Sequence, residues 1–571
     1  MTVARTGPVF DVQDIPFSYA GSWFNLSPVV AEKTLADDLH LVSHQSGLHA
    51  VLRLMPIIDG TRVGTAITAT PGCLAWVNGG GRVDLAYEGP DTIRLRGHGL
   101  GMVVQAARPT LTSFSGTYFY RDPVDGAYLF TDYGTGRRYR VTVLGETTVD
   151  TVGVQALGTG DRGILIAGTQ PWEVAIEEFD SGRPAYRPTA TFEEVAKAAE
   201  AEFAAFVDAV AGWRTDATPA AELAAYVLWS ATVRPAGFVT RPALLMSKHW
   251  MDKVWSWDHC FNALALVDGR PELAWDQYRI VFDHQDAAGG LPDSITHSEV
   301  LYNFVKPPIH GWALQQLRAR LPHLDRVEAG AAYEGLRRWT TFWLTVRRVP
   351  GEALPHYQHG NDSGWDNATT FDPERVIQSA DLAAFLILQL RELAELAGTL
   401  GLDGDAARWT AAAEQTRDAL LEQLWTGDRF VARGVASGRH CGSDSLLDLM
   451  PIALGAELPV PVRDALVVRI RGHLTEHGLA TELPTSPRYE ADGYWRGPIW
   501  APSTLLVEDG LRRAGCVDLA DEISARFRVL CERSGFAENF DALTGVGLRD
   551  RAYTWTASAY LMLAAAYLRR R

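Results

Sequence analysis

The chain has 571 residues, of which 47% are hydrophobic, and its formal net charge at pH 7 is −16. This length exceeds the usual size of one domain, so we expect at least two hydrophobic cores. The acidic balance argues against nucleic acid or an anionic membrane surface as the main partner. The chain also lacks an apolar run typical of a signal peptide or a membrane helix, so we expect a cytoplasmic protein.

Residues 1–190 carry the pattern of a β-rich domain. Apolar or alternating runs, such as HAVLRLMPII at 49–58 and DTIRLRGHGL at 91–100, are separated by Gly, Asp and Pro turns. The turn signals recur roughly every 8–12 residues, which is typical of sandwiches. We therefore expect an antiparallel β-sandwich over 1–190.

Helical periodicity begins near Thr191 and continues along the rest of the chain. The stretch EEVAKAAEAEFAAFVDAVAGW combines good helix formers with an apolar repeat. We expect a helical linker at 191–215 and a helical domain at 216–571. Within that domain we expect helices, with almost no intervening strands, at 218–232, 255–267, 271–284, 308–320, 328–347, 378–399, 404–426, 443–453, 460–476, 500–514, 517–533 and 553–570.

Several of these helices are joined by short connections, which favours antiparallel helix hairpins. Six such hairpins close into a double ring of inner and outer helices, an (α/α)6 toroid. An open bundle or a solenoid accounts for the same number of helices, although the sequence has no fixed-period repeat of the solenoid kind. The fold class we expect is mainly α, with an (α/α)6 toroid preceded by the β-sandwich.

Four long connections interrupt the helices and are rich in Gly, Pro, Trp and polar residues. They lie at 286–306, 348–377, 427–442 and 477–499. Long structured loops on a rigid scaffold usually carry function, and in a toroid they gather over one end. The chain also has 18 Trp residues, which either fill the core or stack against ligands.

The first stretch that combines acids with Trp is WSWDHCF at 255–261. Asp258 follows Trp255 and Trp257 at the expected start of a helix. It either complements the helix dipole or holds sugar hydroxyl groups beside a stacking Trp.

A second stretch runs from GGLPD at 289–293 to KPPIHGW at 306–312. Asp293 ends a Gly-Gly-Leu-Pro turn, and Lys306 precedes a Pro pair that starts a helix. An ordinary turn explains this stretch when it is taken alone.

The third stretch, HGNDSGWDNATTFD, lies in the second long connection. Its acids are Asp362, Asp366 and Asp372, and a loop acid is usually solvated. Asp366 differs because Trp365 precedes it, and an indole face excludes water and raises the pKa of a carboxyl group. A raised pKa is what a general acid requires near neutral pH. We expect Asp362 and Asp372 to cap turns or orient the loop.

The fourth stretch lies at 535–560, where Glu538 precedes a Gly-rich turn and Trp555 opens the last helix. Just upstream, YWRGPIW at 494–500 places Arg496 between two Trp residues, as a cation–π pair in the core or as a substrate clamp. A surface hairpin explains Glu538 equally well when it is taken alone.

Other chemistries have little support in the sequence. It contains no P-loop, no HExxH and no GxSxG motif, and its five Cys residues form no CxxC pair. We therefore expect no metal and no cofactor. Carboxylates beside Trp suit glycoside hydrolysis, which needs two carboxyl groups across the scissile bond.

Together, these motifs resemble glycoside hydrolase family 63 and appear in the family order between about 245 and 560. The trehalase family has a similar set of motifs and is a relative. The motifs that carry the resemblance are WSWDHCF (255–261), GGLPD (289–293), KPPIHGW (306–312), SGWDN (363–367), SADLAAFL (379–386), YWRGPIW (494–500), AENFDALTG (537–545) and YTWTA (553–557).

The resemblance implies a role for each candidate residue. Asp366 matches the general acid and Glu538 the general base, although Phe540 replaces the Tyr of the base motif and removes a hydroxyl group. Asp258 matches the acid that binds the glycone. The family inverts configuration, which implies a carboxyl separation of roughly 6.5–9.5 Å. The other expected substrate-binding residues are Trp257, Asp293, Lys306, Trp365, Trp495, Arg496 and Trp555.

The function we expect is therefore an inverting glycoside hydrolase that cleaves α-glucosidic bonds in small glucosides or short oligosaccharides. One alternative is a hydrolase of glucosylglycerate or mannosylglycerate, which needs a cation such as Arg496 or Lys306 for the glycerate carboxylate; trehalose hydrolysis is another. A non-catalytic carbohydrate-binding protein and an interaction solenoid are alternatives from other classes. The sequence does not indicate an oligomeric state.

Overall fold

The structure, a computed structural model, describes residues 7–321 and 324–570. The chain forms two compact units. The first, here called the β unit, contains the chain through Gly212 together with Ala225–Lys253 and Thr296–Glu299. The second, here called the helical unit, contains Trp213–Ala224, Val254–Ile295 and the chain from Val300 onward.

Two large antiparallel sheets make up most of the β unit. The first sheet contains, in spatial order, β1 (Phe24–Ala31), β2 (Thr34–Ser43), β3 (His49–Ile58), β9 (Gly101–Ala106), β16 (Gly163–Ile166) and β14 (Val149–Val152), with β4 (Thr61–Arg62) beside β3. The second contains β11 (Thr117–Arg121), β12 (Tyr128–Asp132), β13 (Arg138–Leu144), β17 (Trp172–Phe179), β8 (Thr92–His98), β7 (Gly81–Gly89), β6 (Cys73–Asn78) and β5 (Ala66–Thr70). Two short pairs complete the unit: β10 (Thr110–Leu111) with β15 (Gly158–Thr159), and β18 (Thr232–Val233) with β19 (Ala243–Leu244).

The two large sheets contact each other through buried aromatic residues. The ring of Phe24 on β1 stacks on that of Tyr87 on β7 at 5.4 Å, and the Tyr87 hydroxyl donates to the Phe24 carbonyl. These contacts join strands of different sheets around one apolar interior. The antiparallel sheet region predicted near the N-terminus is confirmed.

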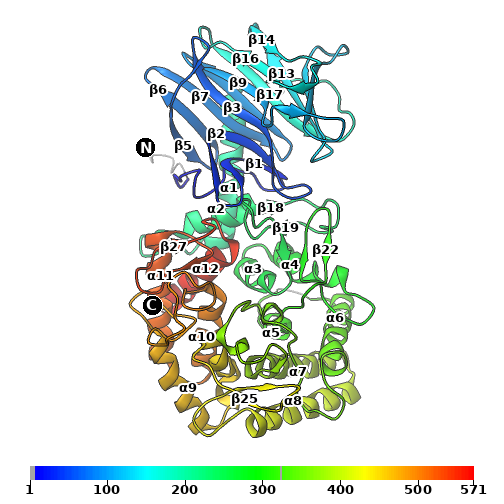
Figure 1. Cartoon of the computed structure of the whole chain (residues 1–571), viewed down its shortest axis with the longest axis vertical. Coiled ribbons are helices and arrows are strands. Elements are labelled where there is room, and N and C mark those ends of the chain that lie inside the picture. Colours follow the sequence, from blue (N-terminus) through cyan, green and yellow to red (C-terminus); the bar gives the residue numbers. More distant parts are fainter. Residues whose placement is uncertain (1–6, 322–323, 571) are drawn as a thin grey trace. The chain divides into compact units, whose positions relative to one another are not determined.

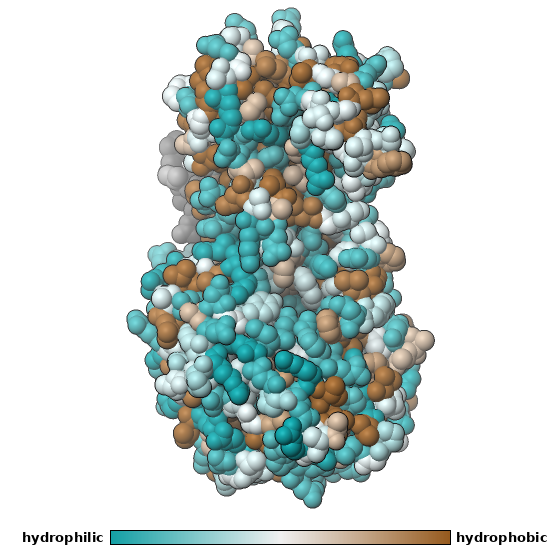
Figure 2. Space-filling model, viewed as in Figure 1, coloured by the Kyte–Doolittle hydropathy of each residue, from teal (hydrophilic) through white to brown (hydrophobic). Residues whose placement is uncertain are grey.

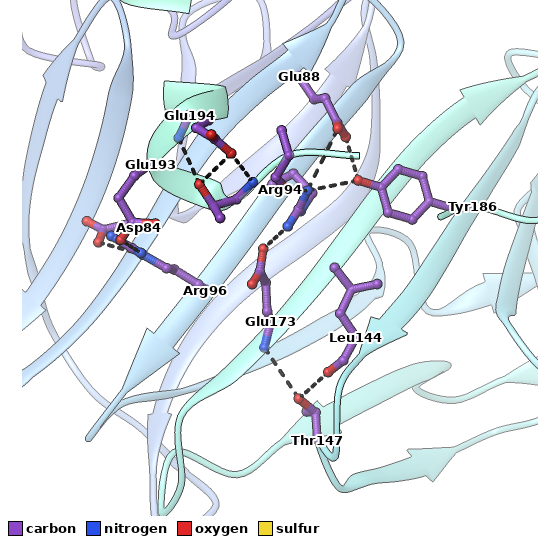
Figure 3. Close-up of polar contacts among 12 residues, drawn as sticks. Asp84, Glu88, Arg94, Arg96, Leu144, Thr147, Glu173, Tyr186, Glu193 and Glu194 are labelled. Carbon is purple, nitrogen blue, oxygen red and sulfur yellow. Dashed lines mark hydrogen bonds and ion pairs between the residues drawn. The ribbon is translucent and has the colours of Figure 1, made fainter. Parts of the chain in front are cut away.

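Helix α1 (Phe192–Ala211) packs against β7 of the β unit. It begins with a capping box, in which the Thr191 side chain accepts from the N–H of Glu194 and the Glu194 carboxylate accepts from the N–H of Thr191. Nearby, the Arg94 guanidinium lies between Glu173 and the Tyr186 hydroxyl (Figure 3). The buried Arg94 is therefore paired with an acid of the same sheet.

Helix α2 (Ala221–Ala231) is divided between the two units, and the helices after it form the scaffold of the helical unit. These are α3 (Asp258–Leu266), α4 (Pro271–Arg279), α5 (His310–Arg318), α6 (Arg326–Thr345), α7 (Ala380–Leu400), α8 (Asp403–Gln423), α9 (Val460–His473), α10 (Ala501–Arg513), α11 (Val517–Ser534) and α12 (Thr554–Arg570). Short 3₁₀ helices lie at η1 (Phe282–His284), η2 (Gly360–Ser363), η3 (Thr369–Phe371) and η4 (Leu446–Glu457).

Six of these elements contact one another in a closed cycle. α3 packs against α5, α5 against α7, α7 against η4, η4 against α10, α10 against α12, and α12 against α3. Figure 1 shows α6, α8, α9 and α11 along the outline of the unit, with α5, α7 and α10 inside them. The loops between these helices can therefore meet above one central region.

Two details of the helical region differ from expectation. The segment expected as a helix at 443–453 is the 3₁₀ element η4, which contains Pro451 and a kink at Gly455. Short strands also intervene where almost none were expected, because two- or three-residue strands have too few positions to show alternation. They are β20 (Val254–Trp255), β21 (Ser294–Ile295), β22 (Val300–Leu301), β23 (Ile377–Gln378), β24 (Ala432–Gly434), β25 (His440–Cys441), β26 (Asn539–Phe540) and β27 (Gly547–Leu548).

The face of the molecule drawn in Figure 2 carries many polar side chains. On the face drawn in Figure 2, hydrophilic side chains predominate over the helical unit, and hydrophobic ones are dispersed among them. In residues 7–321 and 324–570, every helix is too short or too polar to cross a bilayer.

Candidate active site

A small three-stranded sheet brings the first two candidate acids together. β20 pairs with β21, and β21 pairs with β22. The N–H of Ser256 donates to the carbonyl of Asp293 over 3.2 Å. Asp258 lies two residues after Ser256 and begins α3, so this sheet holds Asp293 near the start of that helix.

Asp258 lies inside the protein rather than on the surface of its helix. It is 4% exposed, and its Oδ2 accepts no hydrogen bond from the described residues. Burial raises the pKa of Asp258 to about 8; Lys306 opposes this effect, and the charges of Asp293 and Asp366 add to it. An acid that only complements a helix dipole does not need these neighbours.

Lys306 connects the acids of two different loops. Its Nζ lies 3.1 Å from Oδ1 of Asp293 and 3.9 Å from Oδ1 of Asp366, and it donates to the carbonyl of Asn361 over 3.0 Å. Burial lowers the pKa of Lys306, but the charges of Asp366, Asp293 and Asp258 outweigh burial and raise it overall. Lys306 is therefore a stable cation among three carboxyl groups.

The loop that carries Asp366 has two 3₁₀ turns, η2 and η3, with Gly364 between them. Gly364 has a φ of +74°, and a Cβ there would lie 2.5 Å from the indole of Trp257. Only Gly allows this close packing. Trp365 is buried, whereas the Asp366 side chain is 29% exposed. Burial nevertheless raises the pKa of Asp366, against the opposing charge of Lys306.

The other two acids of this loop have structural partners, as expected. Asp362 is buried and accepts hydrogen bonds from Arg347 Nη1 at 2.7 Å and from the backbone N–H groups of Val305 and Gln358. Asp372 accepts from Arg496. Both carboxylates therefore hold the loop through hydrogen bonds. Asp366 is the acid of this loop that lies near Lys306 and Asp293.

Glu538 lies at the base of the hairpin formed by β26 and β27. Its N–H donates to the carbonyl of Asp550 over 2.7 Å, and the residue is 3% exposed. Burial raises the pKa of Glu538 to about 8, the charges of Asp550 and Asp366 raise it further, and Arg549 opposes them. Phe540, which replaces the Tyr of the resembling motif, is buried against Phe527.

Two tyrosines lie within electrostatic reach of several of these acids. The charges of Asp366, Glu538 and Asp258 all add to burial in raising the pKa of Tyr494. Glu538 and Asp258 act in the same way on Tyr553. Acids that are far apart along the chain therefore lie within electrostatic reach of the same two phenols, both of which stay neutral.

Five buried indoles form one continuous aromatic cluster in the same region. The distance between ring centroids is 4.0 Å for Trp495 and Trp500, 4.6 Å for Trp365 and Trp495, 5.5 Å for Trp500 and Trp555, 5.8 Å for Trp257 and Trp555, and 6.4 Å for Trp257 and Trp495.

The position of Trp495 limits how it can meet a ligand. Trp500 is stacked on it with an interplanar angle of 5°, and Trp365 lies over it with an angle of 30°. Two rings this near cannot share one face of the indole without overlapping, so both faces of Trp495 are covered. Only its edge is left for a ligand.

Arg496 holds two loops together. It donates to the carbonyl of Asn367 over 2.7 Å and to Oδ1 of Asp372 over 2.6 Å. Asn367 in turn accepts from the N–H of Trp495 and donates to the carbonyl of Gly493. Arg496 thus positions the segment that carries Asp366, and these contacts use two of its five N–H donors.

The structure thus brings together the acids predicted from four separate stretches. Sequence reasoning missed three residues beside them: Tyr494, Arg549 and Asp550. Tyr494 was within a recognised motif but was not singled out. Arg549 and Asp550 follow a two-residue strand, and nothing in their local sequence indicates a role.

The arrangement suits proton transfer by carboxyl groups. Asp366 and Glu538 both have raised pKa values, and the charge of Asp366 contributes to the shift at Glu538, which is typical of acid and base pairs in catalytic sites. Among the described residues, no group of three or more His, Cys, Asp or Glu side chains has the geometry of a metal site.

Comparison with known proteins gives a family match over this region. Residues 251–556, more than half of the chain, match the family model of the "Mannosylglycerate hydrolase MGH1-like glycoside hydrolase domain". All of the candidate site residues predicted from the sequence lie within this range.

Related proteins share the same part of the chain. A mannosylglycerate hydrolase of Rubrobacter radiotolerans is 25% identical over 57% of this chain and 92% of its own. One of Thermus thermophilus is 25% identical over 54% of this chain and 93% of its own. A crystal structure of a GH63 mannosylglycerate hydrolase from Thermus thermophilus, in complex with Tris and D-glycerate, has 22% identity and a TM-score of 0.53 over 60% of this chain and 98% of its own.

Proposed function

Because this chain belongs to the family of mannosylglycerate hydrolase MGH1-like glycoside hydrolases, we propose that it hydrolyses the α-glycosidic bond of a glycosylglycerate. Mannosylglycerate and glucosylglycerate are the two candidate substrates. The observation that carries this proposal is the family match over residues 251–556, which contains every candidate acid. The relatives favour this alternative over the α-glucosidase function that we expected first.

We assign the proton transfers to Asp366 and Glu538. Asp366 gives its proton to the glycosidic oxygen as the bond to the anomeric carbon breaks. Glu538 takes a proton from a water molecule, whose oxygen attacks that carbon from the opposite face. This mechanism inverts the anomeric configuration and needs roughly 6.5–9.5 Å between the carboxyl groups. The raised pKa of Asp366 supports its role as the acid.

The sugar ring has two clear hydrogen-bonding partners in this proposal. Oδ2 of Asp258 and Nε1 of Trp555 are buried atoms without a hydrogen-bond partner among the described residues. Buried polar atoms nearly always have a partner, so these two are available to hydroxyl groups of the glycone. Asp293 and Trp257 complete this part of the site.

Lys306 is our candidate for binding the glycerate carboxylate. Lys306 donates to the Asn361 carbonyl, and its charge pairs with Asp293 at 3.1 Å and with Asp366 at 3.9 Å. This cation lies beside Asp366, on the side where the leaving group departs in this mechanism. Arg496 is the second candidate, because two of its five N–H donors are used by Asp372 and the Asn367 carbonyl.

We also propose that the helical unit is an (α/α)6 toroid and that the β unit is a β-sandwich. The closed cycle of contacts from α3 through α12 supports an inner ring. Contacts between Phe24 and Tyr87 support face-to-face sheets. We retain 1–190, 191–215 and 216–571 as the proposed domain boundaries.

The test is a substrate screen with purified protein. Mannosylglycerate, glucosylglycerate, trehalose and other α-glucosides are supplied in parallel, and proton NMR records the first anomer released. We expect hydrolysis of a glycosylglycerate with release of the β-anomer, and no activity in the Asp366→Asn/Glu538→Gln variant. Faster cleavage of trehalose or another glucoside overturns the substrate assignment. Release of the α-anomer overturns the inverting mechanism, and binding without turnover indicates a non-catalytic sugar-binding protein.

A further inference from the structure

Two residues beside the candidate base have an unusual backbone conformation. Tyr494 has a φ of +63° and Arg549 a φ of +60°, although neither is glycine. Such conformations are unfavourable for side chains with a Cβ and persist where surrounding contacts enforce them. Contacts with neighbouring residues must therefore hold both backbones in place.

Arg549 reaches from the base hairpin to a second loop. Its Nη1 donates to Oδ1 of Asn539 over 2.8 Å, and its Nη2 lies 2.6 Å from Oδ1 of Asp492. The guanidinium also lies over the ring of Tyr494, 5.0 Å from its centroid. One side chain thus contacts the residue that follows Glu538 and two residues of the segment 492–494.

These contacts restrain Tyr494 from one side, and its backbone is restrained from the other. The Tyr494 carbonyl accepts a hydrogen bond of 2.8 Å from Trp500 Nε1, and its ring lies edge-on to the Trp500 indole at 5.0 Å. The cation–π contact with Arg549 holds a face of the phenol. Tyr494 is therefore clamped between the aromatic cluster and the base hairpin.

Arg549 and its neighbour Asp550 have opposite effects on the base. The charge of Asp550 raises the pKa of Glu538, whereas the charge of Arg549 lowers it. Arg549 also lowers the pKa of Tyr494, opposing Glu538 and Asp366. Among the neighbours named for Glu538, Arg549 is thus the cation that opposes the two carboxylates, Asp550 and Asp366.

We propose that Arg549 is a positioning residue for the reaction. It fastens Asp492 and Tyr494 to the β26–β27 hairpin and places a positive charge beside Glu538, which holds the base in place and favours its ionised form. This inference rests on the proposed function, because it takes Glu538 as the base. Arg549 itself is not assigned a contact with substrate.

The main test is the pH dependence of kcat/KM for Arg549→Met and Arg549→Lys. We expect Arg549→Met to move the acid limb of the profile upward by about one pH unit, because an unopposed carboxylate binds its proton more tightly. Arg549→Lys keeps the charge but cannot contact Asn539 and Asp492 together. It should leave the limb in place and lower kcat/KM by about tenfold.

Arg551→Met is the matched control on the same hairpin. Arg551 donates to the carbonyls of Gly547 and Ser534, so its loss weakens the hairpin without removing the charge assigned to Glu538. It should lower the melting temperature and leave the acid limb unmoved. A folded Arg549→Met variant with an unmoved limb overturns the proposed effect on the base.

Two further variants complete the test. Asp492 has a side chain that is 68% exposed, so Asp492→Ala should fold even if Arg549→Met does not. This substitution removes the carboxylate and leaves the 3.3 Å hydrogen bond from Arg549 to the Asp492 carbonyl. We expect a severalfold lower kcat/KM, and an unchanged value overturns the role of the carboxylate in the fastening. Glu538→Gln separates the role of Glu538 from that of Arg549. If Glu538→Gln remains active, the proposed base is wrong. If Glu538→Gln is inactive and the acid limb of kcat/KM does not move in Arg549→Met, only the role of Arg549 is contradicted.

Discussion

Nζ of Lys306 lies 3.1 Å from Oδ1 of Asp293, and both side chains are buried. The two residues come from the same long connection, so their ion pair closes that loop over the site. Removing one member of a buried pair leaves an uncompensated charge, which is far more destabilising than exchanging both members.

The first prediction concerns this pair. Lys306→Met should lower the free energy of unfolding by about 3–5 kcal/mol, because Asp293 is left buried and unpaired. Adding Asp293→Asn should recover much of that loss, although activity should stay low. Urea unfolding of the two single variants and the double variant measures the effect. Equal stability of Lys306→Met and the double variant would show that the ion pair does not hold the loop.

The second prediction separates the acid from the base. Asp366→Asn should lower kcat on a glycosylglycerate by about 10²–10⁴-fold, since the leaving oxygen loses its proton donor. On an aryl glycoside whose leaving group needs no proton, the loss should be much smaller. Glu538→Gln should be inactive on both substrates, because each requires an activated water molecule.

Circular dichroism and thermal melting provide the control for these variants. Both substitutions conserve shape and remove a charge, so the fold should persist. If Asp366→Asn loses the same factor on both substrates, the acid is another residue.

The third prediction is the pH profile of the wild-type enzyme. The base must be ionised, and burial together with Asp550 raises the pKa of Glu538 to about 8. Activity should therefore fall as pH decreases through that region, and the acid limb of kcat/KM should lie well above 4.5, the ordinary value for Glu. The apparent values belong to the coupled pair with Asp366. An acid limb at the ordinary Glu value would contradict the environment assigned to Glu538.

The helices and the acids could be predicted from the sequence because their signals are local. Helical periodicity located elements such as α6 and α7 to within a few residues. Asp366 and Glu538 occur in motifs whose order along the chain is itself a signal. The small sheet that joins Asp258 to Asp293 could not be predicted, because strands such as β20 and β21 are two residues long.

Pairings between distant side chains were also beyond the sequence. The residue type of Arg496 suits a substrate clamp, but the structure shows that its side chain donates a hydrogen bond to Asp372. The residue type of Trp495 suits an open stacking surface, but the rings of Trp365 and Trp500 lie 4.6 and 4.0 Å from its own in the structure. In both cases the residue type indicates what it can bind, and only the fold shows what it already contacts.

The fourth prediction follows from the contact between Arg496 and Asp372. Arg496→Met and Asp372→Asn should each lower kcat by about tenfold, because a small displacement of the Asp366 loop weakens proton transfer. The double variant should be little worse than either single variant. Stability should change by about 1 kcal/mol or less, since both side chains are partly exposed. Additive losses in kcat would mean that the two residues act separately.

The last prediction concerns a buried acid behind the same loop. Asp448 accepts hydrogen bonds from Thr370 and Ser443, which joins η3 to η4. Burial raises its pKa from 3.8 to about 7, so the folded protein retains a proton that the unfolded chain releases above about pH 4.

The stability contributed by this neutral carboxyl group is fully present below about pH 4 and is lost as pH rises toward 7. Asp448→Asn keeps a neutral group of the same shape at every pH. Relative to the wild type, the variant should therefore gain stability between about pH 4 and 7, by an amount on the order of 4 kcal/mol. Urea unfolding at a series of pH values measures the difference. A constant difference between the two proteins across this range would show that Asp448 is ionised in the folded state.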